Sequence, residues 1–375
     1  MYICNVIETT MPSLRKIVVQ DFRNIVLQEI SFSPNVNCIS GNNGEGKTNL
    51  LDAIYYLSMT KSAFPAPDRL NWRYGTEGFA LGGTYIMENG TESQFSIKVS
   101  DGEKKLVRDS KPVPRMSDHI GLLPVVMVSP GDIVLVSEGG EDRRRLCNAV
   151  LSQMDREYMA AVQAYNRLLA QRNKVLKEVA PSKELLEVID LKMEPLAANI
   201  VQKRKQFTED LQPVVADYYR LISGGGESVS LEYRSDVLET PLSQLFAAKR
   251  DRDLALRFTA SGPQRDDFLF LMDGHPIRHA GSQGQQKSFL VALKFAQYDI
   301  MRKAYGFPPI LLLDDVFDKL DLGRISNLIG MVAGADFGQI FITDTDSKRL
   351  SGIVDRITQD RAYFDTVNGE FHARA

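Results

Sequence analysis

Residues 41–48 of the chain read Gly41-Asn42-Asn43-Gly44-Glu45-Gly46-Lys47-Thr48. This octapeptide fits the pattern G-x-x-x-x-G-K-S/T in full. It lies between the β-rich run Val36–Ile39 and a segment, residues 50–57, whose apolar side chains have helical spacing. Glycines let backbone N–H groups close around phosphates, and the start of the following helix adds partial positive charge. The stretch therefore predicts a strand, a phosphate-binding loop (P-loop) and a helix. The alternative is a turn-rich loop that matches by chance.

Two side chains of this loop have predicted roles toward bound ATP. Lys47 is expected to reach the β- and γ-phosphates, and the Thr48 hydroxyl is expected to coordinate Mg²⁺. The cofactors expected from the sequence are therefore ATP and Mg²⁺. The predicted nucleotide-binding set of this region comprises Gly41, Asn42, Asn43, Gly44, Glu45, Gly46, Lys47, Thr48 and Asn49.

A second motif lies near the C-terminus, where an apolar run ends in two carboxylates: Ile310-Leu311-Leu312-Leu313-Asp314-Asp315. This is the form of a Walker B strand. Asp314 is expected to hold Mg²⁺ through water, and Asp315 to orient or deprotonate the attacking water. The alternative is a strand merely capped by solvated acids, which a complete P-loop in the same chain disfavours. Asp315 and Lys47 are the predicted catalytic residues.

A third motif, Ser282-Gln283-Gly284-Gln285, precedes the Walker B strand and opens a predicted helix over residues 282–303. Serine is a good N-cap, so an ordinary helix start is one interpretation. In ATPases of the ATP-binding-cassette type, a Ser-x-Gly-Gln signature in this order contacts the γ-phosphate bound by the other subunit. The order and spacing favour this second interpretation, which predicts an ATP-dependent homodimer.

The remaining pattern indicates how these motifs are arranged. β-rich runs around Asn89-Gly90 and Asp101-Gly102 predict hairpins of an antiparallel sheet, and Val125–Val128 predicts a buried strand. After residue 282, helices alternate with the strands Ile310–Leu313 and Ile340–Thr343, which implies a parallel sheet with crossover helices, one of them near Ile325.

Between these regions, apolar residues at steps of three and four predict one long amphipathic helix from Asp142 up to Pro181 and a return helix through Ile222. The fold class is therefore expected to be α/β, a P-loop ATPase head of the ATP-binding-cassette type with an inserted helical arm. The expected domains are residues 1–135 and 256–375 for the two parts of the ATPase lobe, and 136–255 for the arm.

Composition limits the partners of the chain. Lysine plus arginine total 45 against 48 acids, so the net charge of −3 gives no overall attraction to a polyanion, and any nucleic-acid surface must be local. The three cysteines fit neither a disulfide framework nor a zinc site. The sequence contains no apolar run long enough for a membrane span and no signal peptide, so a cytoplasmic location is expected.

Several segments beyond the motifs resemble the RecF family of bacterial recombination mediators, whose heads are similar to those of structural-maintenance-of-chromosomes ATPases. The segments are Asp21-Phe22-Arg23-Asn24, Gly41–Ile54, Tyr165–Lys177, Gly262–Asp267, Ser282–Lys287 and Leu313–Val316 with Leu320-Asp321. The resemblance covers almost the whole chain from Met11. It implies ATP-dependent dimerisation, DNA binding, work with RecO and RecR, and loading of RecA at single-strand gaps, with slow ATP hydrolysis as a release switch.

Candidates for the DNA contacts are two basic runs, Arg143-Arg144-Arg145 and Lys203-Arg204-Lys205. Charge runs of this kind are more often solvated helix faces.

Thr343 and Arg265 have open roles: Thr343 as a γ-phosphate sensor or a strand-end residue, and Arg265 in the nucleotide site, the dimer interface or a structural ion pair. The alternative function is the nucleotide-binding subunit of a membrane transporter, although such subunits generally read Asp-Glu where this chain has Asp314-Asp315.

Overall fold

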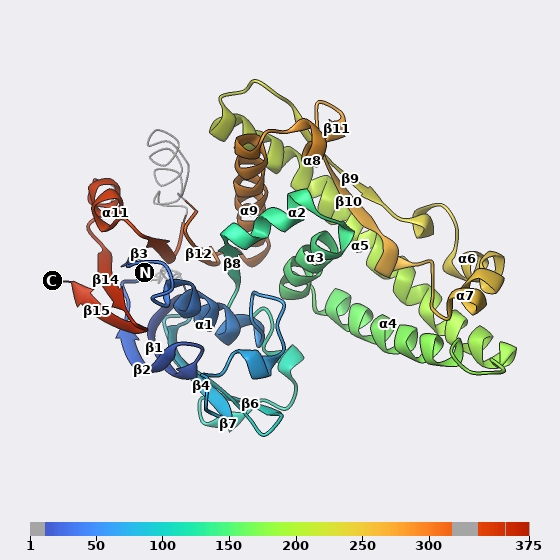
Figure 1. Cartoon of the computed structure of the whole chain (residues 1–375), viewed down its shortest axis with the longest axis horizontal. Helices are drawn as coiled ribbons and strands as arrows, with labels where there is room; N and C mark the ends of the chain where they lie inside the picture. Colours follow the sequence, from blue (N-terminus) through green and yellow to red (C-terminus); the bar gives the residue numbers. More distant parts are fainter. Residues whose placement is uncertain (1–11, 317–336, 357, 375) are drawn as a thin grey trace, which may run out of the picture. The chain divides into compact units, whose positions relative to one another are not determined.

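The computed structural model describes residues 12–316, 337–356 and 358–374 (Figure 1). Contacts divide the chain into two compact units. The first is built from both ends of the chain, residues 1–131 and 301–375, and the second from residues 132–300. In this division residues 256–300 belong to the second unit, whereas the sequence analysis assigned them to the ATPase lobe. The expected domain boundaries at 135/136 and 255/256 stay a prediction. The helix expected near Ile325, the pair Leu320-Asp321 and residues 1–10 lie outside the described residues.

One sheet of the first unit has the strand order β15-β14-β3-β13-β12-β8. Its strands are β3 (Val36–Ser40), β8 (Val125–Val128), β12 (Ile310–Leu313), β13 (Ile340–Asp344), β14 (Arg361–Val367) and β15 (Glu370–Arg374). All pairings are parallel except that of β15 with β14. β3, β8, β12 and β13 are buried along their whole length, as their apolar sequences require. Since they are parallel, β3, β13 and β12 end at one edge of the sheet.

The second sheet of this unit is antiparallel, with the order β2-β1-β4-β5-β6-β7. Its strands are β1 (Ser13–Phe22), β2 (Ile25–Ser31), β4 (Gly78–Ile86), β5 (Glu92–Ser100), β6 (Glu103–Arg108) and β7 (Lys111–Pro112). The hairpin predicted at Asp101-Gly102 is confirmed, and both residues have the positive φ angles, 53° and 75°, that a tight turn needs. Helix α1 (Lys47–Met59) contacts strands of both sheets, which explains why its apolar residues are buried on every side. A short helix, α11 (Ser347–Val354), follows β13.

The second unit is dominated by three helices: α3 (Gly140–Met154), α4 (Arg156–Val175) and α5 (Lys183–Ser223). The prediction of one unbroken helix up to Pro181 is wrong. The chain is extended at Asp155, whose carboxylate accepts a hydrogen bond from the Tyr158 N–H and thereby caps α4. The return helix α5 is continuous through Pro195 and Pro213 and ends at Gly224, where φ is 82°. In Figure 1, α4 and α5 lie side by side, and they pack against each other.

A small sheet, β11-β10-β9, completes the second unit, with β9 (Val229–Arg234), β10 (Asp267–Met272) and β11 (His275–Pro276). A tight turn at Asp273-Gly274, where both residues have positive φ angles, joins β10 to β11. The shorter helices are α2 (Val134–Ser137), α6 (Leu242–Ala248), α7 (Arg250–Leu256) and α8 (Ile277–Ala280), and α9 (Gln283–Tyr305) runs across the boundary of the two units. Among the residues that the structure describes, every helix is too short or too polar to cross a lipid bilayer.

Candidate nucleotide-binding site

The predicted P-loop connects the end of β3 to the start of α1. Gly44 and Gly46 have φ angles of 86° and 111°, a region that residues with a side chain rarely adopt. A Cβ atom at Gly41 would lie 2.6 Å from the carbonyl oxygen of Thr366, so the close approach of β14 also requires glycine there. The sequence G-x-x-x-x-G is therefore what this backbone path allows.

Lys47, the first residue of α1, keeps its charged end against the loop. Its side chain is buried, and Nζ donates hydrogen bonds to the carbonyl oxygens of Gly41 and Asn42, at 2.8 and 3.1 Å. A primary ammonium at the start of a helix, enclosed by loop backbone, is the arrangement expected for a phosphate-binding lysine.

Two carboxylates at the end of β12 lie beside the loop. The Thr48 hydroxyl donates to Asp314, with Oγ1 at 2.9 Å from Oδ1 and 2.8 Å from Oδ2. Thr343, at the end of β13, donates its hydroxyl to Oδ1 of Asp314 at 2.8 Å and accepts the Asp315 N–H at 2.9 Å. Burial raises the pKa of the Asp314 carboxyl, the hydrogen bonds from Thr343 and Thr48 oppose this shift, and the negative charge of Asp315 adds to it.

Asp315 itself has a left-handed backbone, with φ at 44°. A residue other than glycine in this region is strained by about 1–2 kcal/mol, and such strain collects at functional sites. Its N–H is held by Thr343, so the backbone is fixed while the carboxylate, unlike that of Asp314, is only half-buried. Thr343 therefore links the carboxylate of Asp314 to the backbone of Asp315.

The sequence motifs assigned no role to Arg23, Asn24 or Asp52, although all three lie in the RecF-like segments. Asp52 is fully buried and accepts a hydrogen bond from Arg23 Nη2 at 2.6 Å, and Asn24 accepts one from the Asn49 amide at 2.7 Å. A Cβ atom at Gly46 would come within 2.9 Å of the Asn24 side chain. Through these contacts, Arg23, Asn24 and Asp52 hold the P-loop and the start of α1 in position. The sequence does carry one signal of this ion pair: Asp52 lies within the apolar run Leu50-Leu51-Asp52-Ala53-Ile54, and a buried acid needs a partner.

The loop is also held by the C-terminal hairpin. The Glu45 carbonyl accepts the Gly369 N–H at 2.8 Å, and the Glu45 carboxylate accepts the Asn368 N–H. Asn42 and Asn43 are exposed. No sequence pattern indicated that the turn of β14 and β15 would contact the loop.

The predicted signature lies in the second unit. Ser282 and Gln285 form a reciprocal capping box: the Ser282 N–H donates to Oε1 of Gln285 at 2.7 Å, and the Gln285 N–H donates to Oγ of Ser282 at 3.3 Å. Gln285 also donates to Glu227 at 2.6 Å. Ser282, Gln283 and Gly284 are exposed. This geometry is that of an ordinary helix start. The exposed residues remain accessible to a second subunit, so the signature interpretation stays a prediction.

The basic runs need correction. Arg143 is buried, pairs with Asp267 at 3.0 Å and donates to the carbonyl oxygens of Leu135, in α2, and Glu138. Arg204 is also buried and pairs with Asp266 at 2.8 Å. Both guanidinium groups are structural, so the prediction that they contact DNA is wrong. The exposed members are Arg145 and Lys205, and Arg144 and Lys203 are half-buried.

Comparisons with known proteins agree with the motifs. The AAA domain family matches residues 16–212. The DNA replication and repair protein RecF of Parabacteroides distasonis is 42% identical over 95% of this chain and 98% of its own length. That of Porphyromonas gingivalis is also 42% identical, over 95% of this chain and 99% of its own.

Solved structures extend the likeness to the fold. The recombination mediator protein RecF-ATP of the RecFOR pathway has a TM-score of 0.89 at 27% identity and covers both chains fully. An Smc head domain from Pyrococcus furiosus has a TM-score of 0.57 at 16% identity, over 97% of this chain and 96% of its own, and shows a shared fold alone. The expected fold class, an α/β P-loop ATPase head with an inserted helical arm, is confirmed. The chain belongs to the RecF family of DNA replication and repair proteins.

Proposed function

We propose that this chain is an ATPase that binds ATP and Mg²⁺ at the P-loop and uses them to control a DNA-bound dimer. The observation that carries the proposal is the chain of hydrogen bonds from Thr48 through Asp314 to Thr343, next to the buried ammonium of Lys47. It brings a cation, two hydroxyls and the Asp314 carboxylate together beside the P-loop. Lys47 would bind the β- and γ-phosphates, and Asp315 would orient or deprotonate the attacking water.

The residues present fit a Mg²⁺ ion. Mg²⁺ prefers oxygen ligands and is held in nucleotide sites by one or two carboxylates together with substrate phosphates. The Thr48 hydroxyl and the Asp314 carboxylate are oxygen donors within 2.9 Å of each other, and burial already disfavours the charged form of Asp314 unless a cation lies near it. When bound, the ion neutralises charge that develops on the phosphate oxygens.

The exposed signature supports ATP-dependent dimerisation. Ser282, Gln283 and Gly284 present a hydroxyl and backbone N–H groups at a helix start, which suits contact with a phosphate held by another subunit. We propose that ATP joins two subunits in this way and that slow hydrolysis releases them. The names of the relatives, a DNA replication and repair protein and a recombination mediator of the RecFOR pathway, support a role in DNA repair. DNA binding at gaps and loading of RecA with RecO and RecR complete the proposal and rest on the resemblance to the RecF family. The transporter alternative has no such support.

The experiment replaces Lys47 by alanine and measures ATP affinity by calorimetry in the presence of Mg²⁺. Loss of the fixed cation is expected to weaken ATP binding at least about a hundredfold while leaving the fold intact. Lys105→Ala is the matched control, because Lys105 is an exposed lysine of the same unit, on β6. Equal ATP affinity in the Lys47 variant and in wild type would remove the P-loop assignment.

A further inference from the structure

A cavity of about 500 Å³ lies in the second unit, where α3, α4 and α5 meet the chain before β10. All residues that line it belong to this unit, so it is separate from the P-loop. Its size falls in the range of pockets that hold small organic ligands, and it exceeds what a lone inorganic ion fills. Nothing in the ATPase mechanism uses it.

The lining is cationic. Four arginines and one glutamate contribute to it: Arg144, Arg145, Arg204, Arg265 and Glu141. Arg204 is paired with Asp266, and Arg145 with Glu141 and Asp142. Among the described residues, Arg144 and Arg265 form no ion pair with an acid: Arg144 donates to the Asp266 carbonyl at 2.6 Å, and the Arg265 guanidinium lies 5.1 Å from the Phe258 ring centre. Asp267, Asp266 and Glu141 lie near enough to act on the charge of Arg144, but neither Arg144 nor Arg265 makes a direct ion pair among the described residues.

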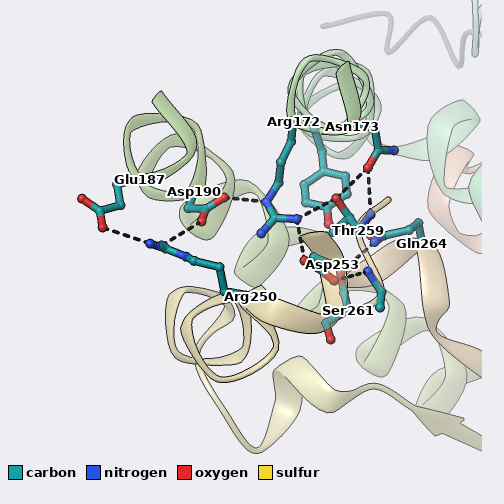
Figure 2. Close-up of polar contacts among 11 residues, drawn as sticks. Arg172, Asn173, Glu187, Asp190, Arg250, Asp253, Thr259, Ser261 and Gln264 are labelled. Atoms are coloured by element: carbon teal, nitrogen blue, oxygen red, sulfur yellow. Dashed lines mark hydrogen bonds and ion pairs between the residues drawn. The ribbon is translucent and has the colours of Figure 1, made fainter. Parts of the chain in front are cut away.

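The amide groups of the lining are oriented as donors. The Asn173 oxygen accepts hydrogen bonds from the N–H and hydroxyl of Thr259, both at 2.8 Å, and Figure 2 shows its nitrogen pointing away from Thr259. The Asn148 oxygen accepts the Tyr158 hydroxyl at 2.6 Å and Arg204 at 3.1 Å. No hydrogen bond among the described residues uses either amide nitrogen. The cavity thus offers N–H donors beside its two unpaired arginines.

A buried ionic network holds this arrangement in place (Figure 2). Arg172 is fully buried, donates to Asp190 at 2.7 Å and Asp253 at 2.6 Å, and also donates to the Thr259 hydroxyl at 2.8 Å. On the cavity side, Gln264 accepts the Tyr165 hydroxyl at 2.6 Å. The network therefore connects α4 and α5 to the segment that precedes β10. This connection holds in place the cavity wall to which Arg265 belongs.

Burial and the nearby charge of Arg204 lower the pKa of the Arg144 guanidinium from its ordinary value, and the carboxylates of Asp267, Asp266 and Glu141 only partly oppose this shift. Arginine still remains protonated at neutral pH, so its positive charge is held in an environment that disfavours it. A bound anion would relieve this cost. Apolar atoms of Val162, Leu169 and Pro263 also line the cavity and suit a sugar or the face of a base.

We propose that this cavity binds the phosphate of a single nucleotide through Arg265 and Arg144, with the amides of Asn148 and Asn173 as further donors. A phosphate matches guanidinium donors in geometry and charge, and the cavity volume leaves room for the attached nucleoside. The nucleotide is either free or part of a DNA strand. Binding of a DNA strand rests on the proposed function. Binding of a free nucleotide does not, because the cavity is separate from the P-loop.

The test is calorimetric titration of the full-length Lys47→Ala protein, in which the P-loop contribution is weakened, with deoxythymidine monophosphate, thymidine and inorganic phosphate. Deoxythymidine monophosphate is expected to bind, and Arg265→Ala to weaken this binding about tenfold or more. The matched control is Arg252→Ala, because Arg252 is an exposed arginine of the same unit that does not line the cavity. Arg265 is exposed, so its replacement leaves the fold intact, which circular dichroism checks.

A short oligothymidylate without terminal phosphates separates the two sources. Binding of the oligonucleotide that depends on Arg265 supports a strand as the source, and binding of the mononucleotide alone supports a free nucleotide. The proposal is overturned if thymidine binds as well as its monophosphate, if inorganic phosphate binds and the monophosphate does not, or if Arg265→Ala and Arg252→Ala behave alike. A separate ATP titration of wild type reports on the P-loop, so failure of one site is distinguishable from failure of the other.

Discussion

The Thr48 hydroxyl donates to both carboxylate oxygens of Asp314, at 2.9 and 2.8 Å, although 266 positions separate the two residues in the chain. The sheet order explains the contact. β13 lies between β3 and β12, all three strands are parallel, and Thr343 at the end of β13 bonds to the same carboxylate. The P-loop and the Walker B strand therefore meet at one edge of one sheet.

Asp314→Asn tests the metal role. Asparagine keeps the shape and can still accept the Thr48 hydroxyl, but it removes the negative charge that would hold Mg²⁺. ATP hydrolysis is expected to fall about a hundredfold or more and to need higher Mg²⁺, as measured by phosphate release across a Mg²⁺ series. Asp101→Asn is the control, since asparagine preserves the turn that Asp101 forms. Unchanged Mg²⁺ dependence would contradict the assignment.

Asp315→Asn tests the role of the second carboxylate. Asparagine tolerates the left-handed backbone found at this residue, whereas alanine would add strain. The variant is expected to bind ATP, to hydrolyse it more slowly than wild type and to accumulate as an ATP-bound dimer, because the signature would stay engaged. Light scattering at saturating ATP measures the mass, and a variant that stays monomeric there is incompatible with the proposed release switch.

The sequence predicted the motifs better than their surroundings. Ile310–Leu313 was expected as a strand and is one, because a short apolar run between turn signals has few alternatives. The break at Asp155 was missed, since the apolar spacing continues across it and only its capping bond to Tyr158 reveals the new helix. Arg143 and Arg204 were interpreted as surface charges because their partners, Asp267 and Asp266, lie far away in sequence. Long-range pairing of this kind leaves no local pattern.

Arg172→Met tests the buried network of the second unit. The change leaves Asp190 and Asp253 buried without their cation, which is expected to cost about 3–5 kcal/mol of unfolding free energy. Arg145→Met removes a guanidinium whose two ion pairs are exposed and is expected to cost less than about 1 kcal/mol. Urea unfolding followed by circular dichroism compares them. Similar midpoints for the two variants would show that the network contributes little to stability.

DNA binding is expected to require ATP, because a subunit with a net charge of −3 holds a polyanion well only if dimerisation joins local basic patches. Of the basic runs, Arg145 and Lys205 remain exposed, and their ion pairs with helix neighbours are weak enough to exchange for phosphates. Lys203 is left unchanged, since it pairs with Asp155, the cap of α4.

The Arg145→Ala/Lys205→Ala protein is therefore expected to show a flatter plot of log affinity against log salt, by about 0.9 for each phosphate of duplex DNA that the variant no longer neutralises. Its ATP affinity is expected to match wild type, and affinity for DNA to vary little with base sequence, because phosphate contacts carry no sequence information. Lys183→Ala/Arg234→Ala, which removes two exposed cations of the same unit, is the control. Equal slopes for both double variants would exclude Arg145 and Lys205 from the DNA surface. Equal DNA affinity of wild type with and without ATP would contradict the gating itself.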